Sequence, residues 1–284
     1  MRGCRRRLAR AAHRLVCARA HSFDVARSGY VNLLQAPDRR SAQPGDGAAI
    51  VQARGRLIAR GLETPITDRI AAMVALDPSD AVLDVGCGEG HHLAVLTGRF
   101  GCEGHGLDIS VAAIEVAAKR RPGLHWVVAN ADRVLPYADA SFRLVTSITA
   151  PRNPTEFRRV LRDDGMLLLA VPAPDDLIEV RERILGKGIE RDRVEKAIAT
   201  FAPLFVLDRR ERIRHAAHLD AAAIRDVMAG SYRAGRASRE ARLAAASALD
   251  VTLSRDVLLF RPARPRPRAQ REEEAGRRKS HERS

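Results

Sequence analysis

One short stretch decides the fold of this chain, residues 82–90, which read Val82-Leu83-Asp84-Val85-Gly86-Cys87-Gly88-Glu89-Gly90. The apolar run of residues 81–85 ends at three alternate glycines, a pattern typical of a strand that turns into a helix. Glycine lets backbone amides approach a ligand where a side chain would clash. The spacing is G-x-G-x-G, with an acid near the end of the strand, and differs from the G-x-G-x-x-G of dinucleotide-binding loops.

Outward from this loop, the apolar pattern alternates between strand and helix periods. We expect strands at residues 81–85, 104–107, 124–129, 144–148 and 166–171, helices at 92–100, 112–120 and 154–161, and an edge strand at 251–260. Strands separated by helices imply right-handed crossovers and a mostly parallel sheet. The predicted fold class is therefore α/β, a Rossmann-like doubly wound sheet.

Polar side chains follow the next two predicted strands. Asp108 comes eighteen residues after Gly90, where its carboxylate can accept hydrogen bonds from both hydroxyls of a ribose. Asn130 ends the third strand, where its amide could read an adenine edge. With the glycine loop, these residues resemble the motifs of class I S-adenosylmethionine-dependent methyltransferases. That resemblance implies a cofactor site lined by Asp84, Gly86, Gly88, Gly90, His91, Asp108 and Asn130.

Composition narrows the class of protein. The chain has 284 residues, of which 45% are hydrophobic and 30% charged, enough to bury a core. Its four cysteines exclude a disulfide-stapled secreted scaffold. No apolar run approaches the ~18 residues of a membrane helix. We therefore expect a globular cytoplasmic protein with no membrane partner.

The net charge of +14 is concentrated at the two ends. Residues 1–20 hold seven arginines and no acid, and residues 261–284 carry a net charge of +5, which leaves +2 for residues 21–260. Basic ends favour a polyanion such as RNA, DNA or an anionic membrane surface. The 45 arginines against four lysines also fit a GC-rich genome, so charge alone leaves both interpretations open.

Four further stretches carry a second, more specific resemblance. They are residues 17–27 (CARAHSFDVAR), 28–34 (SGYVNLL), 43–46 (QPGD) and 150–154 (APRNP). They are similar to the 23S rRNA (guanine-N1)-methyltransferases, in particular the actinobacterial branch that includes the tylosin-resistance methyltransferase. The resemblance runs from about residue 4 to residue 262. It implies a zinc-ribbon-like, RNA-recognising module at 1–36, a linker and helical lead-in at 37–70 and a methyltransferase domain at 71–260. The tail at 261–284 lies outside the resemblance, and its closely spaced prolines and few apolar residues predict a disordered basic segment.

The resemblance also implies a zinc site in the N-terminal module, with the family pattern Cys-x2-Cys followed by Cys-x3-His. Cys4, Cys17 and His21 match three positions, whereas Met1 stands where the first cysteine belongs. A structural zinc site normally takes four ligands. Three possibilities remain open: no metal, His13 as a replacement ligand, or a water in the fourth position.

Two departures from the family concern the reaction itself. Glu63 stands where the family has a tyrosine, and Asp176 stands where it usually has a histidine. Guanine N1 carries a proton on the Watson–Crick edge, so its methylation requires an unpaired base and loss of that proton. A nearby carboxylate is a natural proton acceptor, and the resemblance places Glu63 and Asp176 near the cofactor. A salt-bridged or solvated acid is the other interpretation of each.

The resemblance implies that the chain transfers a methyl group from S-adenosylmethionine to N1 of a guanine in 23S rRNA. It also implies a homodimer, and action on a hairpin near the peptide exit tunnel, where methylation can confer macrolide resistance. Two alternatives remain: a small-molecule methyltransferase of secondary metabolism, and a catalytically impaired cofactor-binding protein that binds RNA.

Overall fold

The computed structural model describes residue 4 and residues 6–35, 44–150, 152–186, 188, 193–231 and 247–263. Within these ranges, no helix has the length and apolar character needed to cross a bilayer. Most of the predicted basic tail, beyond residue 263, lies outside the described residues.

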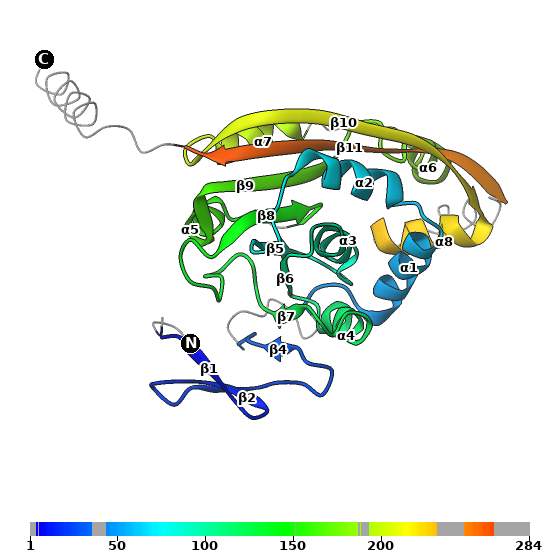
Figure 1. Cartoon of the computed structure of the whole chain (residues 1–284). Coiled ribbons are helices and arrows are strands. Elements are labelled where there is room, and N and C mark those ends of the chain that lie inside the picture. The colour runs from blue at the N-terminus through cyan, green and yellow to red at the C-terminus, as the bar shows by residue number, and fades with distance from the viewer. Residues whose placement is uncertain are drawn as a thin grey trace, which may run out of the picture.

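A large mixed sheet forms the centre of the described structure, with strands in the order β10-β11-β9-β8-β5-β6-β7-β4 (Figure 1). Neighbours from β9 to β4 run parallel, and β11 runs antiparallel to both β10 and β9. The strands are β4 (Val31–Asn32), β5 (Ala81–Val85), β6 (Glu103–Asp108), β7 (His125–Val128), β8 (Phe142–Ile148), β9 (Leu161–Pro172), β10 (Phe205–Asp220) and β11 (Ala248–Pro262). The predicted doubly wound α/β fold is confirmed.

Helices cover both faces of this sheet. Against one face, α2, α3 and α4 pack Ile70, Leu93 and Ile114 into a shared apolar cluster. Against the other, α5 and α7 contribute Phe157 and Phe201. The helices are α1 (Ala48–Ala59), α2 (Thr64–Met73), α3 (His91–Phe100), α4 (Val111–Arg120), α5 (Pro154–Val160), α6 (Ile178–Val180), η2 (Arg181–Leu185), α7 (Val194–Phe201) and α8 (Ala221–Ser231).

The prediction of an edge strand at residues 251–260 is wrong in its position. This segment forms the centre of β11, which is hydrogen-bonded to β10 on one side and to β9 on the other. Its partner β10 is rich in arginine and alternates between exposed and partly buried positions. Such a strand lacks the apolar run that identifies a buried strand, so the pattern of the sequence did not predict it.

The order of the strands reverses beside β5. From β5 the chain proceeds outward to β6 and β7, then crosses to β8 on the other side of β5. In open α/β sheets, ligands bind outside the carboxyl ends of the strands at such a reversal. The carboxyl ends of β5, β6, β7 and β8 are therefore the place to look for a site.

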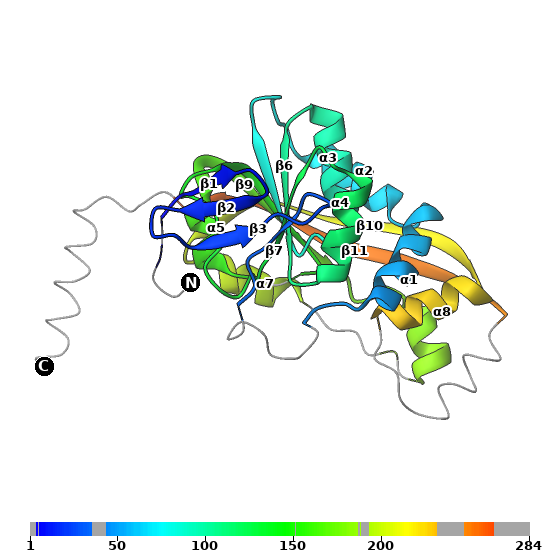
Figure 2. The ribbon, with the colours of Figure 1, turned by 90° about the horizontal axis from the view of Figure 1, so that it is seen from below.

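A small antiparallel sheet precedes this architecture. It contains β1 (Leu8–Ala11), β2 (Arg14–Cys17) and β3 (Ser22–Asp24), which lie side by side in Figure 2. The chain then enters the large sheet as β4, which pairs with β7. Residues 8–24 therefore form a separate sheet, and the expected N-terminal module also supplies one strand to the larger one.

Candidate functional site

The glycine loop joins β5 to α3 through left-handed backbone conformations. Gly86, Gly88 and Gly90 have φ angles of 77°, 55° and 77°. A Cβ on Gly90 would lie 2.2 Å from the indole of Trp126, so this glycine permits close packing. A Cβ on Gly88 would meet no atom within 4 Å. Gly88 therefore has open space where a side chain would lie, as a ligand cradle requires.

Asp84 is the last but one residue of β5 and is almost completely buried, at 2% exposed. Its Oδ1 accepts a hydrogen bond of 2.7 Å from the Thr146 hydroxyl on β8. Burial raises the pKa of Asp84 to about 7, and the nearby Asp108 carboxylate adds to the rise. Asp84 therefore lies inside the scaffold beneath the glycine loop.

Asp108 is the last residue of β6, and its carboxylate is hydrogen-bonded to the glycine loop. Its Oδ2 accepts the Gly88 N–H over 2.9 Å, and its Oδ1 accepts the Ser110 N–H over 2.8 Å. Burial raises the pKa of Asp108, and the Asp46 carboxylate acts in the same direction. Asp46 arrives from the lead-in segment, where its carbonyl accepts the Ser110 hydroxyl over 2.6 Å. The contact places residues 44–46, the described part of the 43–46 motif, near Asp108. The sequence alone does not predict it.

Asn130 follows β7, at the same edge of the sheet as Asp84 and Asp108. Its Oδ1 accepts the Asp132 N–H over 2.9 Å, which shapes the loop after the strand. Asn153, from the motif at 150–154, donates to the carbonyls of Ala131 and Arg133 over 3.0 and 3.1 Å. That motif, whose Pro151 lies outside the described residues, therefore braces the loop that carries Asn130.

Two histidines open α3 directly after the glycine loop. The Nε2 of His91 is buried and has no hydrogen-bond partner among the described residues. His92 Nδ1 lies 2.9 Å from the Thr67 hydroxyl of α2, and burial lowers the pKa of His92 to about 4. The first turn of α3 thus presents neutral imidazoles, one with an unsatisfied polar atom.

The two candidate bases, Glu63 and Asp176, both lie beside the side chain of Arg255. Arg255 of β11, only 12% exposed, forms an ion pair with Asp176 and lies 4.0 Å from Glu63 Oε1. Asp176 also accepts the Ser254 N–H over 2.9 Å. Burial raises the pKa of Asp176, while Arg255 opposes the rise. Glu63 is the more accessible acid, at 26% exposed.

Sequence reasoning missed Arg255, and the signal for it was weak. The residue lies among the apolar positions of β11, and the nearby Asp256 is also almost completely buried. A charge within an apolar strand indicates a buried ion pair, but it does not identify the partner.

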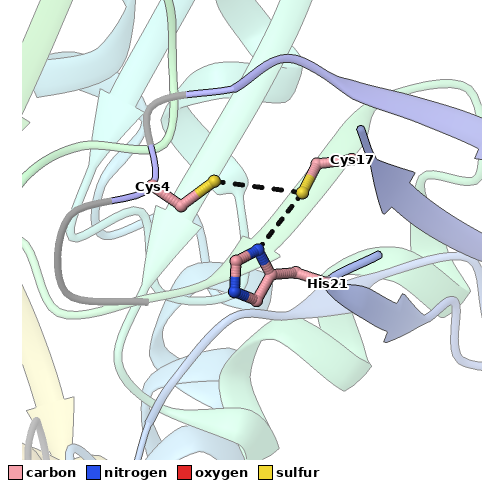
Figure 3. Close-up of side chains that lie close together, drawn as sticks. All are labelled: Cys4, Cys17 and His21. Carbon is pink, nitrogen blue, oxygen red and sulfur yellow. Dashed lines mark hydrogen bonds between the residues drawn. The ribbon is translucent and has the colours of Figure 1, made fainter. Parts of the chain in front are cut away.

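The three zinc-ligand candidates of the N-terminal module converge (Figure 3). The Cys4 and Cys17 sulfurs are 3.9 Å apart, and the Cys17 sulfur is 3.2 Å from His21 Nδ1. All three donor atoms lie within 4.8 Å of one another, a spacing that fits three corners of a tetrahedral zinc site. His13 does not join this group, and the position of Met1 lies outside the described residues.

Known families match both parts of the chain. A family model described as "Methyltransferase domain" matches residues 82–165. A zinc-ribbon family model described as "RlmA, N-terminal" matches residues 4–42. The first contains the glycine loop and Asp108, and the second contains the converging cysteines and histidine.

Individual proteins extend these matches over most of the chain. A 23S rRNA (guanine(748)-N(1))-methyltransferase of Streptomyces fradiae is 38% identical, over 76% of this chain and 78% of its own. A protein of Bacillus subtilis named as a 23S rRNA (guanine-N(1)-)-methyltransferase is 35% identical, over 86% and 90%. Among solved structures, the YcgJ protein of Bacillus subtilis has a TM-score of 0.51 at 18% identity, over 70% of this chain and 98% of that chain, which shows a shared fold.

Proposed function

Because this chain belongs to the family of 23S rRNA (guanine-N1)-methyltransferases, we propose that it transfers a methyl group from S-adenosylmethionine to N1 of a guanine in 23S rRNA. The observation that carries the proposal is the bond from Gly88 to Asp108 at the carboxyl edge of the sheet. It puts an open glycine loop and a buried carboxylate side by side, in a chain that also carries the family's N-terminal module.

The cofactor fits the residues of this edge. The open face of Gly88 and the unpartnered Nε2 of His91 offer room and a polar contact for the methionine end. Asp108 would accept hydrogen bonds from the ribose hydroxyls, and Asn130 would contact the adenine edge. When bound, S-adenosylmethionine supplies an electrophilic methyl group. Because methyl transfer is an in-line displacement, the main task of these residues is to position donor and acceptor.

Glu63 accepts the guanine N1 proton. Of the two candidate acids it is the more exposed, and it lies at the start of α2, next to the first turn of α3. Asp176 already forms an ion pair with Arg255 and accepts a hydrogen bond from the Ser254 N–H. Its role is therefore to hold the Arg255 side chain in position. The same arginine lies 4.0 Å from Glu63 Oε1, so it also helps to hold the Glu63 carboxylate in position.

The N-terminal module binds the RNA. Arg6, Arg7, Arg10, Arg14 and Arg19 are all exposed, and no acid interrupts residues 6–20. Arginines on such a surface pair with phosphates and position the protein without reading bases. Cys4, Cys17 and His21 would hold a zinc ion. Such an ion would link the segment before β1, the end of β2 and the segment before β3.

Three finer proposals follow from the actinobacterial resemblance. The protein acts in the cytoplasm, pairs as a homodimer around its RNA, and protects the ribosome against macrolides. Size-exclusion chromatography with light scattering tests the dimer. The inhibitory concentration of a macrolide, measured with and without the gene in a host lacking the methyl mark, tests the resistance.

The direct test of the function supplies purified protein with labelled S-adenosylmethionine and 23S rRNA that lacks the guanine-N1 mark. Label recovered in the RNA supports the proposal. Intact binding of S-adenosylhomocysteine without label in the RNA contradicts it, and points instead to a small-molecule acceptor or to a protein without turnover.

A further inference from the structure

A second group of metal-ligating side chains lies away from both sites described above. It consists of Glu103 and His105 on β6 and His125 on β7. Their ligand atoms lie within 4.8 Å of one another. Both imidazole Nε2 atoms contact the same carboxylate oxygen, Glu103 Oε1, at 3.0 Å from His105 and 3.2 Å from His125. Both imidazoles therefore face the same carboxylate oxygen, and the three ligand atoms are gathered in one place.

We propose that these three side chains form a binding site for a divalent transition cation of the Zn²⁺ class. Two histidines and one carboxylate are a common ligand set for zinc, iron, copper and nickel, with water in the remaining positions. The ligand atoms are already gathered, so a cation can insert between them with small side-chain rotations. No change of the backbone is needed.

The backbone and the packing hold the two imidazoles in place. His105 and His125 are direct partners in the parallel register of β6 and β7. Their rings stack with centroids 4.5 Å apart and planes inclined by 22°. The His105 ring is also held edge-on by Tyr137 at 5.4 Å and by Phe142 at 5.2 Å. A ligand fixed in this way loses little conformational freedom when a metal binds.

The cluster is separate from the cofactor edge and from the zinc ribbon. Glu103 begins β6, whereas Asp108 ends it, five residues and roughly 16 Å further along the strand. The ligands come from the large sheet, and none belongs to residues 4–24. Because Glu103 and His125 are more than half exposed, a cation can reach the site from solvent.

The rival interpretation is a surface network of hydrogen bonds between Glu103 and the imidazoles. Exposed pairs of this kind contribute little to stability. His218 and Asp250 form such a pair at 2.8 Å on β10 and β11, with no second imidazole among their described neighbours. This pair offers an internal control for metal binding.

The test is the Zn²⁺ stoichiometry of the full, metal-stripped and tag-free protein, measured by equilibrium dialysis. We expect H125N to bind one fewer tight Zn²⁺ per chain than the wild type, and E103Q to bind that ion at least about tenfold more weakly. H218N keeps the wild-type number. S-adenosylhomocysteine binding checks that each variant is folded.

A C17S background removes the zinc-ribbon site from the count. C17S should retain one Zn²⁺, and C17S with H125N should retain none. Equal stoichiometry of H125N and the wild type, or of C17S with and without H125N, would overturn the proposal. A loss of one ion in H218N would overturn it too, because scattered surface histidines would then account for the binding.

Discussion

Thr146 on β8 donates its hydroxyl to Asp84 on β5 over 2.7 Å, inside the sheet and next to the reversal of strand order. Both side chains are buried, at 0% and 2% exposed. The bond satisfies a carboxyl group whose pKa burial raises to about 7. This buried polar contact therefore joins the side chains of the two strands that flank the switch point, beneath the glycine loop.

Removing this hydroxyl tests the scaffold. T146V leaves the Asp84 carboxyl buried without its donor, so we expect the free energy of unfolding to fall by about 1–3 kcal/mol. Denaturant unfolding followed by circular dichroism measures the change. The control is T200V, which removes a hydroxyl that bonds the Lys196 carbonyl on an exposed face of α7. Equal stability of T146V and wild type would contradict the assigned role.

Asp108 tests the cofactor site. D108A removes the proposed acceptor for the ribose hydroxyls and the acceptor of the Gly88 N–H. We expect S-adenosylhomocysteine to bind about 10–100-fold more weakly, because hydrogen bonds to a charged group contribute about 1.5–3 kcal/mol each. Isothermal titration calorimetry gives the affinity. E115A, which removes an exposed acid from α4, should bind as wild type does. If D108A does so as well, Asp108 is not a ligand.

Glu63 and Asp176 test the assignment of the base. E63Q should lower kcat on RNA by about 100-fold or more, with KM little changed, since general bases typically contribute ~10²–10⁴-fold. D176N instead leaves the charge of Arg255 without its buried partner, so we expect a lower Tm and kcat within a few-fold of wild type at low temperature. The reverse pattern in steady-state kinetics would assign the base to Asp176.

His92 makes stability depend on pH. Its pKa is about 4 in the folded chain and about 6.5 when unfolded, so between these values the unfolded state binds more protons. This histidine therefore contributes stability that is complete above pH 6.5 and is lost as the pH falls toward 4. Asp84, with its raised pKa, acts in the opposite direction in the same window.

The comparison of H92Q with wild type isolates the histidine. The difference in Tm between pH 7 and pH 4.5 should be smaller in H92Q than in wild type, as measured by scanning calorimetry at both pH values. H218N, which changes an exposed histidine, should keep the wild-type difference. The prediction fails if H92Q loses as much stability on acidification as the wild type does.

Cys17 separates RNA recognition from cofactor binding. C17S removes a ligand at the centre of the Cys4–Cys17–His21 group, so we expect weaker RNA binding and slower RNA methylation. S-adenosylhomocysteine affinity should stay within twofold of wild type, because the proposed cofactor residues lie at the edge of the large sheet. Chelation of zinc from the wild type should reproduce the C17S result. A parallel loss of cofactor affinity would show that the two parts do not act separately.

Local patterns made the cofactor side of the fold predictable. The apolar run, the glycines and Asp108 lie close together in the sequence, and each strand and helix from 81 to 171 follows from its own periodicity. The resemblance supplied Glu63 and Asp176 as candidates, but their shared partner Arg255 joins them from a distant strand. Tertiary pairing of this kind leaves no periodic signal.

The same limit applies to β10 and to the contact between Asp46 and Ser110. The sequence of β10 is rich in arginine and has one solvent-exposed face, a pattern that is also typical of a loop. Its strand conformation is identified by its pairing with β11. Asp46 precedes Ser110 by 64 residues, and their contact depends on how the lead-in segment crosses the edge of the sheet.

The central claim is tested most directly by mapping the methylated atom. Unmodified 23S rRNA would be treated with wild-type protein and limiting S-adenosylmethionine, digested to nucleosides and analysed by mass spectrometry against methylguanosine standards, with a protein-free reaction as the blank. The account predicts N1-methylguanosine, at no more than one residue per 23S rRNA, and much less of it in a parallel D108A reaction. A methyl group on another atom or another base, or RNA without any methyl group while the protein binds S-adenosylhomocysteine, would contradict it.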